Sequence, residues 1–330
     1  MLRLQITVAF LSLSCAGADS VAADRVSAAP ATVAAPSPVV SRATVVDETA
    51  PAERLEVDVD GHPISVWFKT AAEPRDVIVL LHGRTWSARP DFDLQVEGES
   101  RSSMDALVAQ GFAVYAVDLR GYGATPRDDT GWLTPDRADK DLAEVLRFVG
   151  SKHPTLAKPS LLGWSLGSLV AQLTAQRHAE LLSSLVLFGY PRDPAQTYTA
   201  DPPDRTPSRK KTTTKAAAED FIVRGAISQR GADAFAKAAV AADPVRADWR
   251  GSEQWNALKP EAVAVPTLLI HGERDPYAPK EKQAALFRRL GHADRAWVIL
   301  AGCDHAAHLE RCGPRFTHAV VQFIRRPVAQ

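Results

Sequence analysis

The segment at residues 163–167, Gly-Trp-Ser-Leu-Gly, constrains the fold of this chain more than any other feature. It follows a short apolar run at 161–162 and precedes a stretch with apolar residues at helical spacing. The pattern predicts a strand, a sharp turn and a helix, with Ser165 at the turn. The small glycines on either side avoid a collision with the neighbouring turn, and the strained backbone projects the hydroxyl above the sheet. Ser165 is therefore the candidate nucleophile.

Unbroken apolar runs recur along the chain, and helical stretches separate most of them. The runs lie at 77–81, 112–117, 185–188, 267–270 and 297–300, and the helical stretches at 134–149, 284–290 and 316–324. Such runs are typical of strands that are buried on both faces of a parallel sheet. Residues 55–60 and 63–68 flank Asp60-Gly61 and predict an antiparallel hairpin. The alternation predicts an α/β fold with a mostly parallel, doubly wound sheet.

One interval breaks this alternation. The connection between Phe188 and Thr267 is much longer than a single crossover helix requires. The excess predicts an inserted subdomain, and the spacing of Phe235, Ala239 and Ala242 predicts a helix in its second half.

The loop after the strand at 77–81 predicts a site for negative charge. Gly83 lets the chain turn immediately after the strand, so the backbone N–H of Arg84 can point toward the N–H of Leu166. Two such donors would form an oxyanion hole for a carbonyl attacked by Ser165. His82 is interpreted as a structural residue of this loop rather than as a base.

The acid and the base are expected further along the chain. Asp275 and His305 both lie just past the end of a predicted strand. Because the carboxyl ends of parallel strands meet at one edge of a sheet, both side chains can converge on Ser165. Asp193 and Asp304 are alternative acids. Asp275 is preferred to Asp304 because Asp304 would have to fold back on its own neighbour.

Taken in order, these motifs resemble the α/β-hydrolase fold family of serine hydrolases. The resemblance covers about residues 54 to 327 and rests on His82-Gly83, on 118–123 (Asp-Leu-Arg-Gly-Tyr-Gly), and on Ser165, Asp275 and His305. It implies an eight-stranded sheet and a Ser-His-Asp triad. It also implies a hydrolase core at 54–189 and 261–330, and a helical cap at 190–260 after the sixth strand.

Two departures narrow the function that the resemblance implies. Family members that open epoxides or cleave carbon–halogen bonds place an aspartate where this chain has Ser165. Relatives of proline iminopeptidase carry Trp-Gly-Gly after the serine, whereas this chain has Leu166-Gly167-Ser168. The expected function is therefore hydrolysis of a carboxylic ester or lactone through an acyl-enzyme. A peptidase or aminopeptidase, a perhydrolase, a C–C hydrolase and a non-catalytic binding protein remain alternatives.

The expected substrate is a small molecule, and no cofactor is expected. Trp86 and Trp164 flank the oxyanion loop and the nucleophile and are candidate substrate-binding residues, while Trp249 and Trp255 are candidates for the roof of the pocket. Filling of the core is an equal alternative for these tryptophans. His308 has no HExxH or CxxC context, so no metal is expected. The 39 basic and 39 acidic side chains balance, which argues against nucleic acid as a partner.

The N-terminus predicts export. Residues 1–23 have the charged start, apolar stretch and small residues of a signal peptide with cleavage after Ala18 or Ala23, and lipidation at Cys15 is the alternative. The apolar stretch is shorter than the ~20 residues that a membrane span needs. Residues 24–53 are rich in Ala and Pro and predict a disordered linker. Thiols become oxidised in the periplasm and outside the cell. A disulfide is therefore predicted between Cys303 and Cys312, which lie on either side of the candidate base in the sequence.

Overall fold

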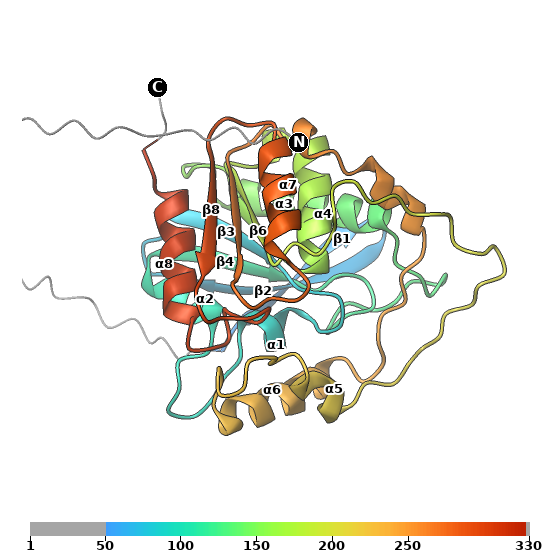
Figure 1. The fold of residues 1–330 in the computed structure, drawn as a ribbon, viewed down its shortest axis with the longest axis horizontal. Helices are drawn as coiled ribbons and strands as arrows, with labels where there is room; N and C mark the ends of the chain where they lie inside the picture. The colour runs from blue at the N-terminus through green and yellow to red at the C-terminus, as the bar shows by residue number, and fades with distance from the viewer. Residues whose placement is uncertain (1–50, 328–330) are drawn as a thin grey trace, which may run out of the picture. The chain divides into compact units, whose positions relative to one another are not determined.

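The computed structural model describes residues 51–327, which form an eight-stranded sheet with helices on both faces (Figure 1). The strand order is β1-β2-β4-β3-β5-β6-β7-β8. Strand β2 pairs antiparallel with β1 and with β4, and the remaining pairs are parallel. The mostly parallel sheet and its N-terminal hairpin confirm the predicted fold class. The strands are β1 (Glu53–Val59), β2 (His62–Thr70), β3 (Asp76–Leu81), β4 (Phe112–Val117), β5 (Ser160–Trp164), β6 (Ser184–Phe188), β7 (Thr267–Gly272) and β8 (Arg295–Leu300).

Helices cover the two faces of the sheet in separate groups. Residues of α3, α4 and α7 share one hydrophobic cluster, and residues of α1, α2 and α8 share the other. These helices are α1 (Ala88–Phe92), α2 (Ser103–Ala109), α3 (Pro135–Lys152), α4 (Leu166–Arg177), α7 (Lys280–Arg289) and α8 (Gly313–Ile324), and a 3-10 turn, η1 (Ala179–Leu181), follows α4. Within residues 51–327, every helix is too short or too polar to traverse a lipid bilayer.

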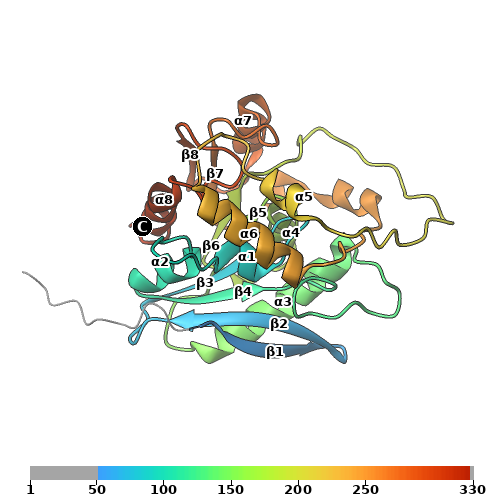
Figure 2. The same ribbon diagram turned by 90° about the horizontal axis from the view of Figure 1, so that it is seen from below.

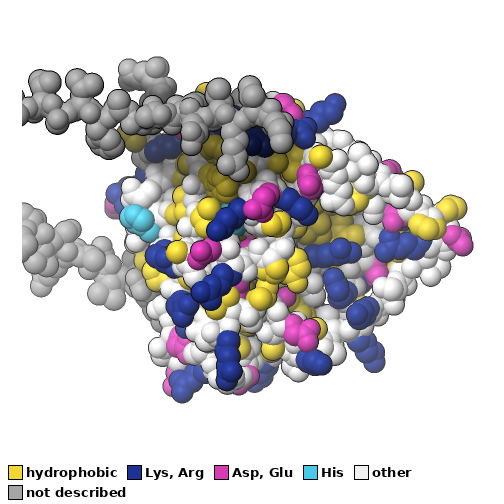
Figure 3. Space-filling model, viewed as in Figure 1, with side chains coloured by type: hydrophobic (Ala, Val, Ile, Leu, Met, Phe, Trp, Pro, Cys, Tyr) yellow, Lys and Arg dark blue, Asp and Glu magenta, His cyan; other side chains and the backbone are white. Residues whose placement is uncertain are grey.

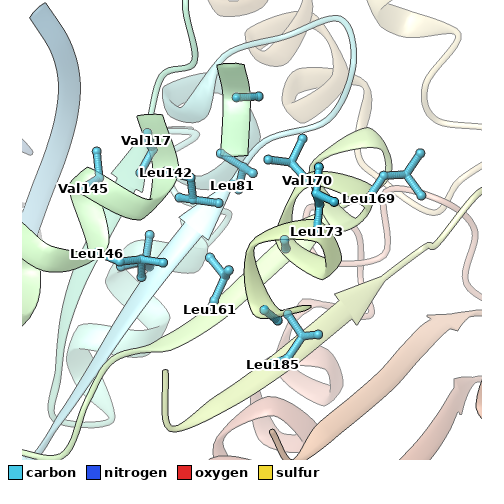
Figure 4. Packing of buried hydrophobic residues seen from close by; sticks show 14 of the residues in the cluster. Leu81, Val117, Leu142, Val145, Leu146, Leu161, Leu169, Val170, Leu173 and Leu185 are labelled. Atoms are coloured by element: carbon cyan, nitrogen blue, oxygen red, sulfur yellow. The ribbon is translucent and has the colours of Figure 1, made fainter. Parts of the chain in front are cut away.

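Alternate residues of each central strand enter opposite clusters. On β3, Val79 packs with the α3 and α4 cluster, whereas its neighbour Leu80 packs on the α2 and α8 side. Figure 4 shows the first cluster, in which Leu142 and Leu146 of α3 lie close to Leu161 of β5. A strand with apolar residues at every position is therefore buried on both faces, as the sequence predicts.

The prediction that each apolar run is a strand buried on both faces is wrong for the last strand, β8. β8 lies at the edge of the sheet and pairs only with β7 among the described strands. Most of its residues are partly exposed, and Ile299 is 40% exposed. An apolar run cannot distinguish an edge strand from a central one, because burial at the edge depends on which helices reach it.

The connection between β6 and β7 contains α5 (Thr214–Ala218), α6 (Gln229–Ala242), η2 (Ser252–Ala257) and η3 (Pro260–Ala262). Helix α6 packs against α1 and α5 packs against α6, and Figure 2 shows α6 lying across α1. The side chain of Phe235 on α6 is buried against Trp86 of the core. The helical segments therefore cover part of the core. The signal peptide predicted at 1–23, and all but the last three residues of the predicted linker, lie outside the described residues.

The turn from β5 to α4 has the close backbone approach that its glycines predict. Ser165 adopts φ 54° and ψ −121°, a strained conformation for a residue with a side chain. A Cβ atom at Gly163 would lie 2.3 Å from the carbonyl oxygen of Gly167, and one at Gly167 would lie 2.3 Å from that of His82. Only glycine fits at these two positions.

Replacement of Gly163 by alanine tests this packing. We expect Gly163→Ala to destabilise the fold by ~1–3 kcal/mol or more, because the added methyl group would meet backbone atoms that cannot move aside. Gly150→Ala is the matched control. Gly150 lies within α3, and a Cβ atom at this position would meet nothing within 4 Å. The control should leave stability unchanged or raise it by about 0.5–1 kcal/mol. Urea unfolding midpoints that are equal for the two variants would contradict the packing argument.

Candidate active site

Ser165 lines a cavity of about 550 Å³. It follows β5 directly and precedes α4, and its amide N–H donates to the carbonyl of Phe188 at 2.9 Å. The cavity wall includes Arg84, Leu166 and His305 together with residues of the connection between β6 and β7. The candidate nucleophile therefore faces a space that the core and its insertion enclose together.

Asp275 and His305 are in direct contact. The Nδ1 atom of His305 lies 2.7 Å from Oδ2 of Asp275, whose side chain is completely buried. The other carboxylate oxygen accepts from the backbone N–H groups of Tyr277 at 2.8 Å and Ala278 at 3.2 Å. Because three donors hold the carboxylate, it can fix one orientation of the imidazole and leave Nε2 free for chemistry.

Aromatic rings and one glycine fix the position of His305. The indole N–H of Trp164 donates to the carbonyl oxygen of His305 at 2.9 Å, and the ring of Tyr277 lies 4.9 Å from the imidazole. Gly189 follows β6 with φ +57°, and a Cβ atom there would lie 3.0 Å from the imidazole ring and 3.2 Å from Asp275 Oδ2. Sequence reasoning missed Gly189, although a glycine directly after a buried strand was an available signal.

The two predicted oxyanion donors line the same cavity. Within residues 51–327 neither the Arg84 nor the Leu166 amide donates to a protein acceptor. Leu166 is the first residue of α4, so its N–H belongs to the free amino end of the helix. The hydroxyl of Tyr122 donates to the carbonyl oxygen of Arg84 at 2.5 Å, which restrains the peptide that follows. Both amides are thus available to a negatively charged oxygen.

His82 holds the oxyanion loop. Its Nδ1 lies 2.8 Å from the carbonyl oxygen of Gly83, and its Nε2 accepts from the backbone N–H of Leu119 at 3.1 Å. Burial lowers the pKa of His82 to about 4, so the ring is neutral near pH 7. Its position agrees with a structural role rather than with that of a base.

Asp91 lies under the same loop and was not singled out from the sequence. Its Oδ2 accepts from the Gly83 N–H at 3.2 Å, and its Oδ1 is buried and has no partner within the described part of the chain. Burial raises the pKa of this carboxyl well above its ordinary value, which favours the neutral acid. His308 is buried beside it, and its Nε2 lies 2.8 Å from the Asp91 carbonyl oxygen.

The two alternative acids lie elsewhere. Asp193 accepts from the backbone N–H of Ala195 at 2.9 Å. Asp304 accepts through Oδ2 from the N–H of Val223 at 2.5 Å and through Oδ1 from that of Ala306 at 3.1 Å. Neither carboxylate lies within 4.0 Å of a ring nitrogen of His305. Among the described residues, the carboxylate that contacts this ring is that of Asp275.

The four candidate tryptophans all line the cavity. Trp164 lies next to Ser165, and the indole N–H of Trp86 donates to Asp220 Oδ2 at 2.6 Å. Trp249 donates to the Tyr122 hydroxyl at 2.8 Å, and its ring centre lies 5.9 Å from that of Trp255. The tryptophans therefore combine core packing with a place in the cavity wall, so the two interpretations are not exclusive. Asp220 was not recognised from the sequence, because no motif or predicted strand end marks it.

The comparisons with known proteins agree with this fold, which is that of the α/β-hydrolase serine hydrolases. A family model described as "Serine aminopeptidase, S33" matches residues 72–312. This match spans more than half of the 330 residues, and the chain belongs to that family. The family resemblance inferred from the sequence is therefore confirmed.

Individual relatives span most of the chain. The mouse (Mus musculus) protein "Serine hydrolase BPHL" is 26% identical over 282 residues, which cover 82% of this chain and 86% of the relative. A "2-hydroxy-6-oxo-6-(2'-aminophenyl)hexa-2,4-dienoic acid hydrolase" of Metapseudomonas resinovorans is 26% identical, and the match covers 87% of this chain and 96% of the relative. A "pimeloyl-[acyl-carrier protein] methyl ester esterase" of Sodalis glossinidius (strain morsitans) is 28% identical and covers 78% and 96%. Two of these three relatives are named for different substrates, a dienoic acid and a methyl ester.

Solved structures share the fold at lower identity. A thioesterase domain from the curacin biosynthetic pathway superposes with a TM-score of 0.60 at 18% identity, covering 83% of this chain and 99% of that domain. A thermophilic esterase from Thermogutta terrifontis superposes with a TM-score of 0.58 at 20% identity, covering 83% and 99%. At these identities the likeness concerns the fold alone.

A buried carboxyl beside the His305 loop generates a pH prediction. Burial and the neighbouring Asp304 raise the pKa of Glu310 above its ordinary value of 4.5. The folded chain then keeps a proton that the unfolded chain releases, so this group's contribution to stability is complete below about pH 4.5 and decreases as the pH rises through the folded pKa.

We expect Glu310→Gln to reduce the loss of unfolding free energy between pH 5 and pH 9. Urea unfolding of both proteins at several pH values measures this difference. Glu281→Gln removes the same charge from an exposed position on α7 and serves as the control. Parallel stability curves for the wild type and Glu310→Gln would show that Glu310 ionises alike in the folded and unfolded chains.

Proposed function

We propose that this protein hydrolyses a carboxylic ester or lactone through an acyl-enzyme formed on Ser165. The observation that carries the proposal is the 2.7 Å contact between His305 Nδ1 and the buried Asp275, in the wall of the cavity that contains Ser165. An imidazole held by a carboxylate beside an accessible serine matches the nucleophile, base and orienting acid of acyl transfer. In this proposal Ser165, His305 and Asp275 form the catalytic triad.

The proposed reaction proceeds in two balanced steps. Ser165 Oγ attacks the acyl carbonyl while His305 Nε2 takes its proton, and the C–O bond to the alcohol then breaks as the alkoxide accepts that proton. Water next attacks the acyl-enzyme, with His305 again acting first as base and then as acid. Asp275 stabilises the imidazolium that forms in each step. For a lactone, the alcohol stays attached to the acyl group as the ring opens.

The Arg84 and Leu166 amides are the proposed oxyanion donors. Their support is the absence of other acceptors for them within residues 51–327, together with the amino end of α4 beneath the nucleophile. A donor of this kind typically contributes ~3–4 kcal/mol to the transition state. Trp86 and Trp164 are proposed to contact the bound substrate, because both line the cavity beside these groups.

The C–C hydrolase is the second candidate function, because the Metapseudomonas resinovorans hydrolase named above is similar over almost its whole length. The Sodalis glossinidius methyl ester esterase supports the ester proposal over a comparable span. A panel of esters and lactones of graded acyl and alcohol size, a vinylogous 1,5-diketone acid and aminoacyl anilides separates these functions. A preference for the diketone acid or for the anilides over all esters would contradict the ester proposal.

Loss of the serine hydroxyl tests the nucleophile. We expect Ser165→Ala to lower turnover of the best ester by up to ~10⁶, because triad members act as a unit. A fluorophosphonate should label the wild type at Ser165 and leave the variant unlabelled. Ser168→Ala is the matched control, since Ser168 lies one residue beyond Gly167 on α4 and donates to the Ser165 carbonyl oxygen at 2.5 Å. Full turnover by Ser165→Ala would refute the assignment.

We further propose that the chain is exported and that Cys303 and Cys312 form a disulfide there. The support is the N-terminal sequence and the structure's placement of the two cysteines, whose Cα atoms lie 6.2 Å apart with their sulfur atoms joined. Both cysteines are buried, and the segment between them carries His305. The bond would tie this segment to the start of α8.

Peptide mapping tests the disulfide. Non-reducing digestion of protein recovered from the periplasm or medium should yield a linked peptide, and reduction should lower stability by ~2–3 kcal/mol for so short a ring. Cleavage of the predicted signal peptide would remove Cys15, so the exported chain would contain only the two cysteines of the proposed disulfide. Two free thiols at 303 and 312 in exported protein would contradict the proposal.

A further inference from the structure

The cavity above Ser165 is rich in arginine. Four arginines line it (Arg84, Arg192, Arg205 and Arg246), against two aspartates, Asp91 and Asp220. Arg84 belongs to the core loop after β3, whereas the other three belong to the connection between β6 and β7. Figure 3 shows further Lys and Arg side chains on the outer surface at the right of the view, where Figure 1 places much of this connection.

Three of these arginines have no acidic partner. Arg205 forms an ion pair with Asp201 at 2.8 Å. Within residues 51–327, Arg84, Arg192 and Arg246 have no carboxylate oxygen within 4.0 Å. Guanidinium groups remain charged at any pH that proteins tolerate, so the three positive charges persist in the wall of one cavity.

Arg192 is the most constrained of the three. It is only 4% exposed, and its Nε atom is buried without a partner in the described chain. Its terminal nitrogens donate to the carbonyl oxygens of Pro194, at 3.5 Å, and Gln196, and its guanidinium lies 5.7 Å from the ring centre of Tyr198. Carbonyl oxygens and an aromatic face orient a guanidinium but do not neutralise it. A buried cation of this kind is stabilised when an anion enters the cavity.

The two aspartates do not cancel this charge. Burial raises the pKa of Asp91 well above its ordinary value, which favours the neutral form of its carboxyl. Burial also raises the pKa of Asp220, to about 6, and its carboxylate already accepts from Trp86. At most two carboxylates therefore face three guanidinium groups that have no acidic partner within the described residues. The cavity keeps a net positive charge.

We infer that the substrate carries a carboxylate in addition to the ester or lactone bond that is cleaved, and that Arg192 and Arg246 bind this carboxylate. The inference rests on the proposed hydrolase function and specifies its substrate class. A guanidinium binds a carboxylate through two parallel N–H···O bonds, which gives both charge and orientation. With the anion bound by the insertion, the ester group is directed toward Ser165.

Three methyl esters of equal chain length test the inference. Monomethyl adipate is anionic, methyl 6-hydroxyhexanoate is neutral and methyl 6-aminohexanoate is cationic, and p-nitrophenyl acetate is the reference ester. We expect kcat/KM for the anionic ester to exceed that for the neutral ester by about tenfold or more, with the cationic ester poorest. Addition of 0.5 M NaCl should reduce this preference, because salt screens charge.

Variants locate the effect. In Arg246→Gln and Arg192→Gln, the ratio of kcat/KM for the anionic ester to that for the neutral ester should fall at least fivefold. Arg246 is half-buried and its side chain makes no hydrogen bond within the described residues, so its variant remains informative if Arg192→Gln does not fold. Arg288→Gln removes the same charge from an exposed position on α7 and should keep the wild-type ratio.

The outcomes separate the inference from the proposed function. A wild type that hydrolyses the neutral ester as well as the anionic one overturns the inference and leaves the proposed function standing. A preference for the cationic ester overturns it in favour of recognition by Asp220. Hydrolysis of none of the esters, including p-nitrophenyl acetate, contradicts the proposed function itself.

Discussion

The site depends on backbone segments that approach one another more closely than ordinary side chains allow. The missing side chain of Gly167 lets the start of α4 lie against the carbonyl of His82, which brings the nucleophile turn beside the oxyanion loop. Gly189 similarly leaves room for the contact between His305 and Asp275. These approaches occur at the carboxyl ends of neighbouring parallel strands. Reactive groups that are far apart in sequence therefore meet only because the sheet packs correctly.

Buried carboxylates hold the loops around this centre. Asp118 accepts from the backbone N–H of Ala88 at 2.8 Å, and Asp243, from the connection between β6 and β7, accepts from that of Ser87 at 2.8 Å. Burial raises the pKa of Asp118 to about 6 and also raises that of Asp243. Their hydrogen bonds to backbone amides offset part of this cost. The oxyanion loop is thus held from the core and from the insertion at once.

The sequence predicts the core of this arrangement because the core has local signals. Ser165 lies in a five-residue motif, and Asp275 and His305 each follow an apolar run, so their meeting follows from the order of strands. Asp91 and Asp220 carry no such pattern, and Gly189 follows an apolar run but has no reactive group. The roles of all three arise from contacts between distant segments. The edge position of β8 was missed for the same reason. Its residues are as apolar as those of a central strand, and only the completed sheet shows that no described strand covers its outer side.

The charge of the cavity arises from a different part of the chain than its chemistry. The candidate triad belongs to strand ends and loops of the core, where small displacements would separate the reacting groups. Arg192 and Arg246 belong to the insertion, and their side chains make no hydrogen bond to the described residues of the core. Substitutions in the insertion can therefore change which substrates enter without disturbing the contact between His305 and Asp275. Relatives that are named for different substrates are consistent with this division, because the fold fixes the reactive centre while the inserted segment sets the shape and charge above it.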